Sequence, residues 1–214
     1  MAMLKETKQD KRELILATAL QLFIERGYLE TKVIDIAIAA GIAKGSVYAY
    51  FPSKETLFVE LLKEHVVAPY VEFKDSSDRD GGASSEKLRR FVRFEQNVAL
   101  RFGNGKNFID LLFAEKGLAR HPELEAVMDK FMKLRFALVY GIVDTGIRKG
   151  EFFGKDPNLL TLSIMGSIAM YISHQCGLLF HAAEYPLGLS QPTEISEDVF
   201  FRFLLHGLYP SKNC

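Results

Sequence analysis

Apolar side chains recur along the chain at three- and four-residue spacing, which is the period of an amphipathic α-helix. No stretch alternates apolar and polar residues for long enough to indicate a β-sheet. Turn residues divide the helical pattern into segments. Gly27, Gly41 and Gly150 are typical of positions just past a helix end, and Pro52 cannot continue a helical hydrogen-bond ladder. The sequence therefore predicts an all-α fold.

Four helices are expected in the N-terminal part of the chain. They cover residues 8–26, 32–40 and 43–50, followed by a helix that Ser53 caps and that reaches about Tyr70, where Pro69 suggests a kink or an end. The stretch 75–85, which reads DSSDRDGGASS, predicts a surface loop. Beyond this loop we expect helices at 86–102, 107–120, 122–149, 157–181 and 193–208.

Composition is that of an ordinary globular protein. The chain of 214 residues has 27 Lys plus Arg, 27 Asp plus Glu and 48% hydrophobic residues, which excludes a disordered or strongly charged polymer. Cys176 and Cys214 lie too far apart for a CxxC pair, so neither a disulfide framework nor a zinc site of that type is expected. The first residues lack the apolar stretch of a secretory signal, and a cytoplasmic location is expected.

One uncharged stretch, residues 159–183, is long enough to cross a bilayer. Several Ser, Thr, Gln and His residues interrupt it, and no basic cluster flanks either end. A helix buried in a core or in a subunit interface is the favoured interpretation over a membrane span.

Residues 31–51 carry the most informative pattern, because two short helices flank a glycine turn, as in a helix-turn-helix. Small helical bundles share this pattern, so the chemistry of the second helix must distinguish a DNA-binding motif from a purely structural helix pair. If Val47 and Phe51 point inward, a narrow outward face remains. That face consists of Lys44, Gly45, Ser46, Tyr48 and Ala49. Small side chains let the backbone approach a DNA groove, while Lys, Ser and Tyr can donate to phosphates or base edges.

Three segments carry a resemblance to a known family. They read RELILATALQLFIERGY at 12–28, VIDIAIAAGIAKGSVYAYFPSKETLF at 33–58 and, more weakly, RKGEF at 148–152. The chain resembles the TetR family of transcriptional repressors. This resemblance implies a DNA-binding domain, taken as residues 1–53, and a larger effector-binding and dimerisation domain, 54–214. It also implies an all-helical homodimer that binds a pseudo-palindromic operator and is released by a small effector.

The resemblance implies a phosphate contact by Thr31, recognition-helix contacts by Lys44, Gly45, Ser46 and Tyr48, and a DNA-backbone contact by Lys54. Lys32 and Tyr50 are further candidates, although helical periodicity turns Tyr50 partly inward. The outward face has no Arg, Asn or Gln for bidentate base contacts. We therefore expect part of the specificity to come from DNA shape and from the methyl group of Ala49 against thymine.

The chain departs from the family pattern at two places. Ala43 stands where the family commonly has Ser or Thr, so the side-chain cap of the recognition helix is lost. Ile34 and Ile38 stand where polar or charged residues are usual. They are either single exposed residues that pack on a neighbour, or a contact between adjacent dimers on DNA.

All but three of the 17 phenylalanines lie beyond residue 70. An aromatic-rich helical domain either fills its own core or encloses an apolar cavity for a mainly hydrophobic effector. The candidate effector contacts are Phe94, Phe108, Leu112, Phe136, Tyr140 and Met170, with His174 as either a polar anchor or a hydrogen-bonded core residue. The candidate dimer contacts are Gly166, Ala169, Gly177, Val199 and Phe203.

Enzyme signatures are missing from the sequence, which has no GxSxG, GxxxxGK[ST] or HExxH motif. His174 and Cys176 lie two residues apart and point to different sides of a helix, so no metal or cofactor is expected. Two alternatives to a regulator remain. One is a helical ligand-binding protein that does not bind DNA, and the other is a small helical enzyme that uses His174.

Overall fold

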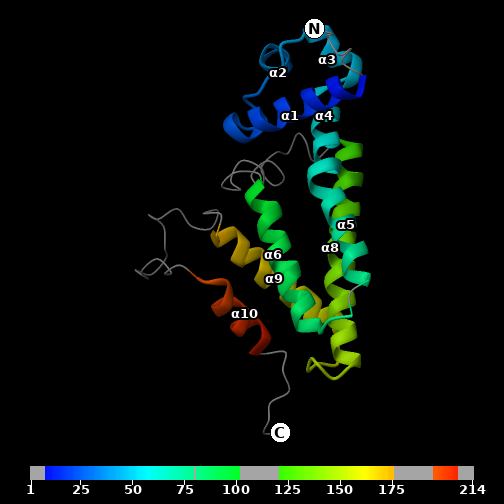
Figure 1. Cartoon of the computed structure of the whole chain (residues 1–214), viewed down its shortest axis with the longest axis vertical. Helices are drawn as coiled ribbons and strands as arrows, with labels where there is room; N and C mark the ends of the chain where they lie inside the picture. The colour runs from blue at the N-terminus through cyan, green and yellow to red at the C-terminus, as the bar shows by residue number, and fades with distance from the viewer. Residues whose placement is uncertain (1–7, 80, 102–120, 176–194, 207–214) are drawn as a thin grey trace, which may run out of the picture. The chain divides into compact units, whose positions relative to one another are not determined.

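The computed structural model describes residues 8–79, 81–101, 121–175 and 195–206, and every regular element in these ranges is helical (Figure 1). The predicted all-α fold is confirmed. The elements are α1 (Lys8–Arg26), α2 (Val33–Ala39), α3 (Lys44–Tyr50), α4 (Lys54–Leu62), the π-helix η1 (Lys63–Val67), α5 (Ala68–Arg79), α6 (Ser84–Arg101), α8 (Pro122–Arg148), α9 (Pro157–Gln175) and α10 (Glu197–His206). The expected helix at 107–120 lies outside the described residues.

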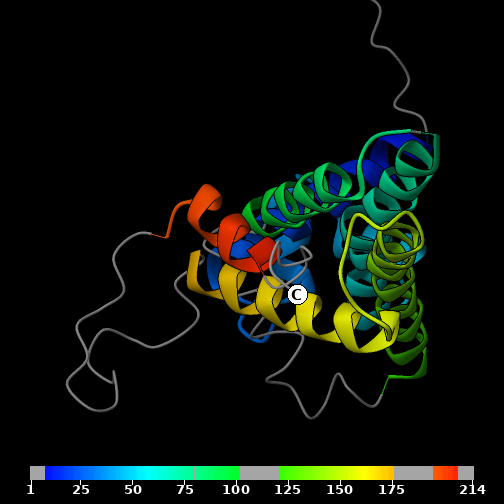
Figure 2. The same ribbon diagram turned by 90° about the horizontal axis from the view of Figure 1, so that it is seen from below.

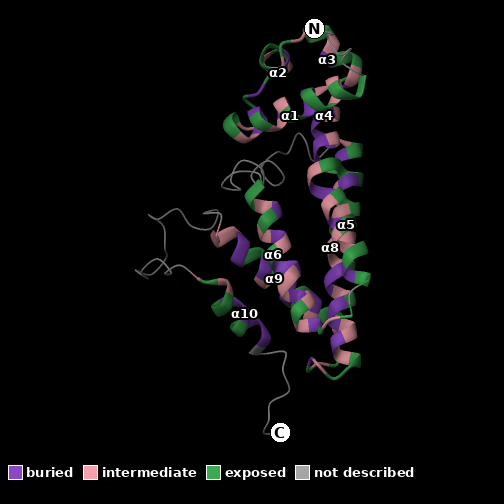
Figure 3. Cartoon of the chain, viewed as in Figure 1, coloured by how far each residue is buried: buried purple, intermediate pink, exposed green. Residues whose placement is uncertain are grey.

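The chain forms two compact units, residues 1–69 with 107–130 and residues 70–106 with 131–214. The domain division predicted at residue 53 separates a DNA-binding motif from the remainder of the chain, and it stays a prediction. In both units, buried and exposed residues alternate along the helices at helical spacing, as amphipathic helices require (Figure 3).

The first unit has an apolar core to which α1 contributes a buried stripe. The buried stripe of α1 includes Ile15, Leu22 and Phe23, and Gly27 ends the helix in the left-handed conformation with φ 82°. The ring of Phe23 lies 5.3 Å from that of Tyr28 and 5.9 Å from that of Phe58, centroid to centroid. These contacts fix the end of α1 against α4 and so provide the platform on which α2 and α3 rest.

The helix around Pro69 continues instead of ending, and its geometry changes first. Pro69 has no N–H, and in an α-helix its ring would collide with the carbonyl of His65. Residues Lys63–Val67 form a π-helix, and the Ala68 N–H donates to the Lys63 carbonyl five residues earlier. This wider turn accommodates the proline.

The prediction of a loop at 75–85 is wrong at both ends, because α5 continues to Arg79 and α6 begins at Ser84. Local contacts explain the extra helical turn. Lys74 pairs with Asp78 four residues later, and the Arg79 Nε donates to the Asp75 carbonyl at 2.9 Å. Turn-forming composition was therefore outweighed by an ion pair and a side-chain cap.

The second unit is built around α6 and α9, with α10 lying beside both (Figures 1 and 2). Fully buried side chains from α6, α8, α9 and α10 belong to its core, among them Phe91, Val139, Ile168 and Phe201. Close packing at the end of α8 is set by Gly146, because a Cβ there would lie 2.3 Å from the ring of Phe152.

Within the described residues no single helix is long and apolar enough to cross a bilayer, although the bent pair of α2 and α3 meets the criteria by length and composition alone.

Candidate nucleic-acid interface and effector region

Helices α2 and α3 form a helix-turn-helix in which the chain bends by 108°. The turn depends on Gly41, whose φ of 67° lies in the left-handed region. Two backbone hydrogen bonds close it, from Gly41 N to the Ile38 carbonyl at 3.1 Å and from Ile42 N to the Ala37 carbonyl at 3.0 Å. At the other end of α2, the Lys32 N–H donates to the Asp35 carboxylate at 3.1 Å, which fixes the start of the helix.

The outward face of α3 is open. Val47 and Phe51 are 1% and 3% exposed and pack inward, as periodicity predicts. Tyr48 is 42% exposed, and Lys44, Gly45 and Ala49 are exposed as well. The space around Gly45 is empty, since a Cβ built there would meet no atom within 4 Å. No acidic residue lies on this helix.

A cation and an aromatic hydroxyl lie together on that face. The Lys44 Nζ lies 5.6 Å from the centroid of the Tyr48 ring. Ser46 is half-buried beside them, and Tyr50 is half-buried with its ring 6.4 Å from that of Phe51. Tyr50 is therefore partly turned inward, in agreement with its helical position. The face offers hydroxyl and ammonium donors above an unobstructed stretch of backbone, which is the chemistry that phosphates and groove edges accept.

Two residues expected to contact phosphates are used inside the protein. Thr31 is 0% exposed, and its hydroxyl donates to the carbonyls of Gly27 at 2.7 Å and Leu22 at 3.2 Å. The Lys54 Nζ donates to three carbonyls, those of Tyr28, Leu29 and Thr31, at 2.7, 3.4 and 3.0 Å. Sequence reasoning did not foresee these internal contacts, because a family pattern reports residue type and position but not which atoms a side chain reaches. The phosphate contacts of Thr31 and Lys54 stay predictions.

The two departures from the family pattern have visible structural consequences. Ala43 occupies the N-cap of α3 in an extended conformation with no side-chain cap, whereas the Ser53 hydroxyl caps α4 by accepting from the Thr56 N–H at 3.0 Å. Ile34 and Ile38 on α2 are 39% and 71% exposed. A contact by these isoleucines between adjacent dimers stays a prediction.

The described residues predicted to bind an effector lie on three helices, α6, α8 and α9. Phe94 on α6 packs against the rings of Tyr70 and Phe73, at 4.7 and 4.5 Å between centroids. Phe136 and Tyr140 on α8 stack on each other at 6.0 Å. Met170 and His174 on α9 line a groove described below, and Phe108 and Leu112 lie outside the described residues.

An apolar groove with a volume of about 730 Å³ lies between α9 and α10. The predicted dimer residues Gly166, Val199 and Phe203 line it together with Met170 and His174. Ala169 is exposed on α9, and Gly177 lies outside the described residues. Residues predicted as effector contacts and residues predicted as dimer contacts therefore line the same groove. Helical spacing alone does not show which face of a helix meets which neighbour.

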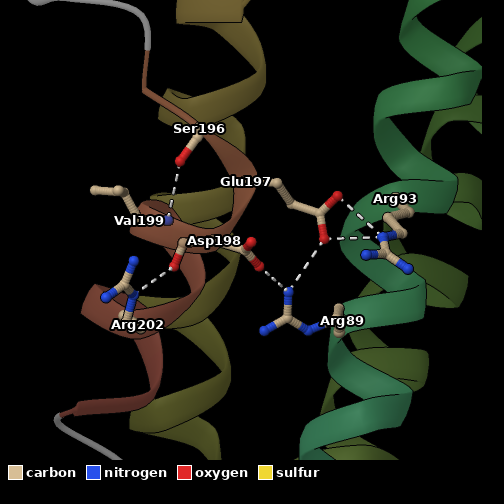
Figure 4. A network of polar contacts seen from close by, with 7 residues as sticks. All are labelled: Arg89, Arg93, Ser196, Glu197, Asp198, Val199 and Arg202. Carbon is tan, nitrogen blue, oxygen red and sulfur yellow. Dashed lines mark hydrogen bonds and ion pairs between the residues drawn. The ribbon is translucent and has the colours of Figure 1, made fainter.

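Helix α10 is held against α6 by a network of ion pairs (Figure 4). Arg89 bonds Asp198 at 2.8 Å and Glu197 at 3.3 Å, and the Arg93 Nε bonds Glu197 at 2.8 Å. The Arg89 guanidinium also lies 4.3 Å from the centroid of the Phe201 ring. These contacts set the orientation of one wall of the groove.

A buried polar cluster in the second unit was not foreseen from the sequence. Glu95 on α6 is 3% exposed and accepts two hydrogen bonds from Arg135 on α8, one of them at 2.6 Å, and another from the Tyr70 hydroxyl at 3.0 Å. Burial and the neighbouring Glu95 charge raise the pKa of Tyr70 well above its ordinary value. Burial lowers the pKa of Arg135, but the hydrogen bonds and charge of Glu95 outweigh it and raise that pKa overall.

The sequence held one signal for this cluster. Glu95 falls on the apolar stripe of α6, in register with Leu88, Phe91, Val92 and Val98. A charge in such a position needs a buried partner. Nothing in the spacing identifies that partner as Arg135. Within the described residues no group of three His, Cys, Asp or Glu is arranged to hold a metal ion.

Comparison with known proteins matches the region of the helix-turn-helix to a family of regulatory proteins. Residues 15–61 match the model of the bacterial regulatory proteins, tetR family. The chain is 27% identical over 162 residues to the fatty acid metabolism regulator protein of Bacillus subtilis (strain 168), a match covering 75% of this chain and 81% of the relative. It is also 27% identical over 168 residues to the HTH-type transcriptional regulator RutR of Escherichia coli (strain K12), covering 75% and 73%.

Solved structures show the same fold at lower identity. One is the transcriptional regulator FadR from Bacillus subtilis in complex with stearoyl-CoA, with a TM-score of 0.64, 21% identity and coverage of 92% of this chain and 99% of that one. Another is a putative transcriptional regulator from Saccharomonospora viridis in complex with choline, with a TM-score of 0.72, 19% identity and coverage of 95% and 100%. The likeness extends well beyond residues 15–61.

Proposed function

Because the chain belongs to the TetR family of bacterial regulatory proteins, we propose that it is a cytoplasmic repressor that binds a pseudo-palindromic operator as a homodimer. A small, mainly hydrophobic effector binds the second unit and releases the protein from DNA. Release requires that the effector bind one state of the dimer better than the other, since equal affinity for both states shifts no population.

The open face of α3 carries the DNA-binding part of this proposal. Lys44 and Tyr48 project from a short helix with no acidic residue, and Gly45 leaves its backbone accessible. Lys32, at the start of α2, adds a second exposed cation. A few lysines on a chain with equal numbers of acidic and basic residues give moderate, salt-sensitive affinity, so specificity depends on groove shape as well as direct contact.

The α9–α10 groove supports the dimer. Phe203 is 73% exposed and Leu162 is 60% exposed, while Gly166 has open space above its Cα. One face therefore carries both a projecting ring and a shallow floor, and such a face is self-complementary under two-fold symmetry. We place Phe203 against Gly166 of the partner subunit. Met170 and His174 then face the second copy, and Phe94, Phe136 and Tyr140 remain as candidate effector contacts.

Selection of bound duplexes from a random DNA library tests the regulator proposal. Enrichment of one palindromic sequence by the full chain, lost in Tyr48→Ala, is the expected result. Phe153→Ala is the matched control, because this 67% exposed aromatic residue lies in the second unit, outside α3. If the protein is folded and dimeric but enriches no sequence, the result would instead favour the alternative of a ligand-binding protein that does not bind DNA.

Sedimentation equilibrium of the full chain tests the dimer. Phe203→Ala and Gly166→Leu should each weaken association, the first by removing the ring and the second by filling the floor. The double variant Phe203→Ala/Gly166→Leu exchanges large and small side chains and should recover part of the lost affinity. Additive losses in the double variant would contradict the pairing.

The comparison structures suggest effector probes. Stearoyl-CoA, bound in the FadR structure, carries a long apolar acyl chain on a large, charged coenzyme A group, and choline, bound in another, is small and cationic. With the selected operator in hand, we expect stearoyl-CoA to release the protein while coenzyme A alone and choline do not. Release by choline alone would contradict a mainly hydrophobic effector.

A further inference from the structure

The buried cluster of Glu95, Arg135 and Tyr70 uses only one edge of the arginine. The Arg135 Nε and Nη2 atoms donate to the two carboxylate oxygens of Glu95, the second bond at 2.6 Å. In the part of the chain that the structure describes, Arg135 makes no further hydrogen bond, so both protons of Nη1 and one of Nη2 have no acceptor. Its side chain is 14% exposed, and Nη1 is not among the fully enclosed polar atoms. This free edge of Arg135 is therefore accessible.

The carboxylate of the cluster is fully engaged. Glu95 Oε1 accepts from Arg135 Nε and from the Tyr70 hydroxyl, and Oε2 accepts from Nη2. Because Tyr70 shares Oε1 with Nε, it lies on the Glu95 side of the guanidinium. Burial and the Glu95 charge raise the pKa of Tyr70, so its hydroxyl keeps the proton that it donates. The free edge thus belongs to a cation whose charge is already balanced.

Aromatic rings lie around this cluster. The Tyr70 ring is 4.7 Å from that of Phe94 and 5.0 Å from that of Phe131, centroid to centroid. Phe131 stands one turn before Arg135 on α8, and Phe94 directly precedes Glu95 on α6. Both phenylalanines are half-buried. A molecule bound to the free edge therefore has aromatic surface within reach of an apolar chain.

We infer that the free edge of Arg135 binds a neutral carbonyl oxygen of the effector, one joined to an apolar chain as in a long-chain ketone or ester. The Nη1 and Nη2 donors of this edge lie side by side, and the two lone pairs of one carbonyl oxygen accept both. This inference rests on the proposed function, because it names the chemical class of the same effector.

Charge distinguishes a carbonyl from other polar groups here. A carboxylate on the free edge would place a second negative charge beside Glu95, with one guanidinium between them. It would also lose its water shell, and a guanidinium already balanced by Glu95 offsets that loss only in part. A cationic group finds no free acceptor on Glu95, since both oxygens are occupied. A neutral carbonyl gains its hydrogen bonds without either penalty.

Two probes with ten carbons each test this inference on the full chain without DNA. The first, 2-decanone, has a neutral carbonyl, and decanoate is ionised at about pH 7.5, because ordinary carboxyl pKa values lie near 4. Titration calorimetry should show roughly tenfold tighter binding of 2-decanone. Equal affinities, a preference for decanoate, or no binding of either probe would overturn the inference.

Glu95→Gln removes the balancing charge and keeps the size of the side chain. Its amide oxygen still accepts from Arg135, but the guanidinium now carries net positive charge, so decanoate should bind roughly tenfold more tightly than to wild type. A cluster that only holds α6 against α8 would not change the selectivity between the probes. An unchanged ratio of the two affinities would overturn the inference.

Arg135→Lys keeps a cation for Glu95 but removes the flat pair of donors, so 2-decanone should bind roughly tenfold more weakly. Arg148→Lys is the matched control, because Arg148 is 70% exposed near the end of the same helix. The triple variant Glu95→Leu/Arg135→Met/Tyr70→Phe leaves no buried charge and should lose the preference for 2-decanone even if Arg135→Lys fails to fold. Wild-type selectivity in either folded variant would overturn the inference.

Release from the selected operator separates this inference from the proposed function. We expect 2-decanone to release wild type and Arg148→Lys at lower concentration than Arg135→Lys. If 2-decanone binds with the expected selectivity but does not release the protein from DNA, the proposed function fails and the Arg135 contact stands. If an operator is selected but wild type does not prefer 2-decanone to decanoate, the inference alone fails.

Discussion

The two units place their charged side chains differently. In the first, Lys54 and the hydroxyl of Thr31 bind backbone carbonyls of one short segment. In the second, Glu95 binds Arg135, and Arg89 binds Asp198, pairs that join helices 40 and 109 residues apart in the sequence. Both units join helices by ion pairs, since Arg12 of α1 also pairs with Glu60 of α4, but in the first unit Lys54 and Thr31 in addition fix the backbone of one segment.

This difference bears on what each unit does. A motif that fits a DNA groove needs one defined backbone shape, and capped carbonyls provide it. A unit that responds to an effector needs helices that can change partners, and ion pairs between helices form discrete alternatives. Removing one partner of a buried pair such as Glu95–Arg135 is strongly destabilising, but replacing both partners by apolar residues is often tolerated.

The largest effect is expected at the buried cluster of the second unit. Glu95→Leu leaves the Arg135 guanidinium buried without its carboxylate, which costs about 3–5 kcal/mol of unfolding free energy. Urea unfolding followed by exchange or fluorescence in the second unit measures this cost. Adding Arg135→Met and Tyr70→Phe to Glu95→Leu removes every polar group of the cluster and should recover most of the loss. If the triple variant is less stable than the single one, the cluster acts through packing and not through charge.

A smaller effect is expected where α8 meets the segment after it. Gly146→Ala places a Cβ 2.3 Å from the buried Phe152 ring, and displacing that ring should cost about 1–3 kcal/mol. Gly141→Ala is the matched control in the same helix, because its Cβ would meet no atom within 4 Å. There the better helix propensity of alanine should stabilise by up to about 1 kcal/mol. Equal effects at both positions would show that Phe152 yields without cost.

The two units also differed in how far the sequence predicted them. The helix-turn-helix was predicted to within a residue at each end, because glycine turns, proline and a short apolar stripe are local signals. The open face of α3 followed from the same periodicity. The internal bonds of Thr31 and Lys54 did not, since they depend on where a side chain ends in three dimensions.

In the second unit the helices were predicted, but the contacts between them were not. The Glu95–Arg135 pair and the groove shared by Met170 and Phe203 come from contacts across long sequence separations. The extra turn of α5 was missed because Ser and Asp residues favour loops on average, whereas here Lys74 and Asp78 pair along the helix.

In the first unit, the uncapped start of α3 offers a modest gain in stability. Ala43→Ser should stabilise the protein by about 1 kcal/mol, because the N-cap backbone is already extended and only the side-chain acceptor is missing. Ser53→Ala is the reciprocal experiment, since it removes the existing cap of α4 and should lower the free energy of unfolding by a similar amount. Thermal unfolding should shift upward in the first variant and downward in the second. A downward shift in Ala43→Ser would mean that the alanine packs in a way the hydroxyl disrupts.

The smallest effect concerns acid stability, where each unit has one informative carboxylate. Burial opposes ionisation of Glu60, but Lys63 and Arg12 outweigh it and hold the pKa of Glu60 below its ordinary value of 4.5. The pKa of Glu151 is lowered mainly by the Ser84 backbone N–H, which donates to it at 2.6 Å. A lowered folded pKa gives stability that is present above the unfolded pKa and is lost as pH falls through the folded value.

Unfolding free energy should therefore decrease as pH falls below about 4.5, and Glu60→Gln and Glu151→Gln should each remove part of that decrease, by at most about 1 kcal/mol for partly exposed groups. Salt distinguishes the two units. At about 1 M salt the Debye length falls to about 3 Å, so the Glu60 contribution, which depends on cations, should shrink. The Glu151 contribution depends on a backbone hydrogen bond and should persist. Equal loss of both in salt would show that charges, and not the backbone hydrogen bond from Ser84, hold the pKa of Glu151 low.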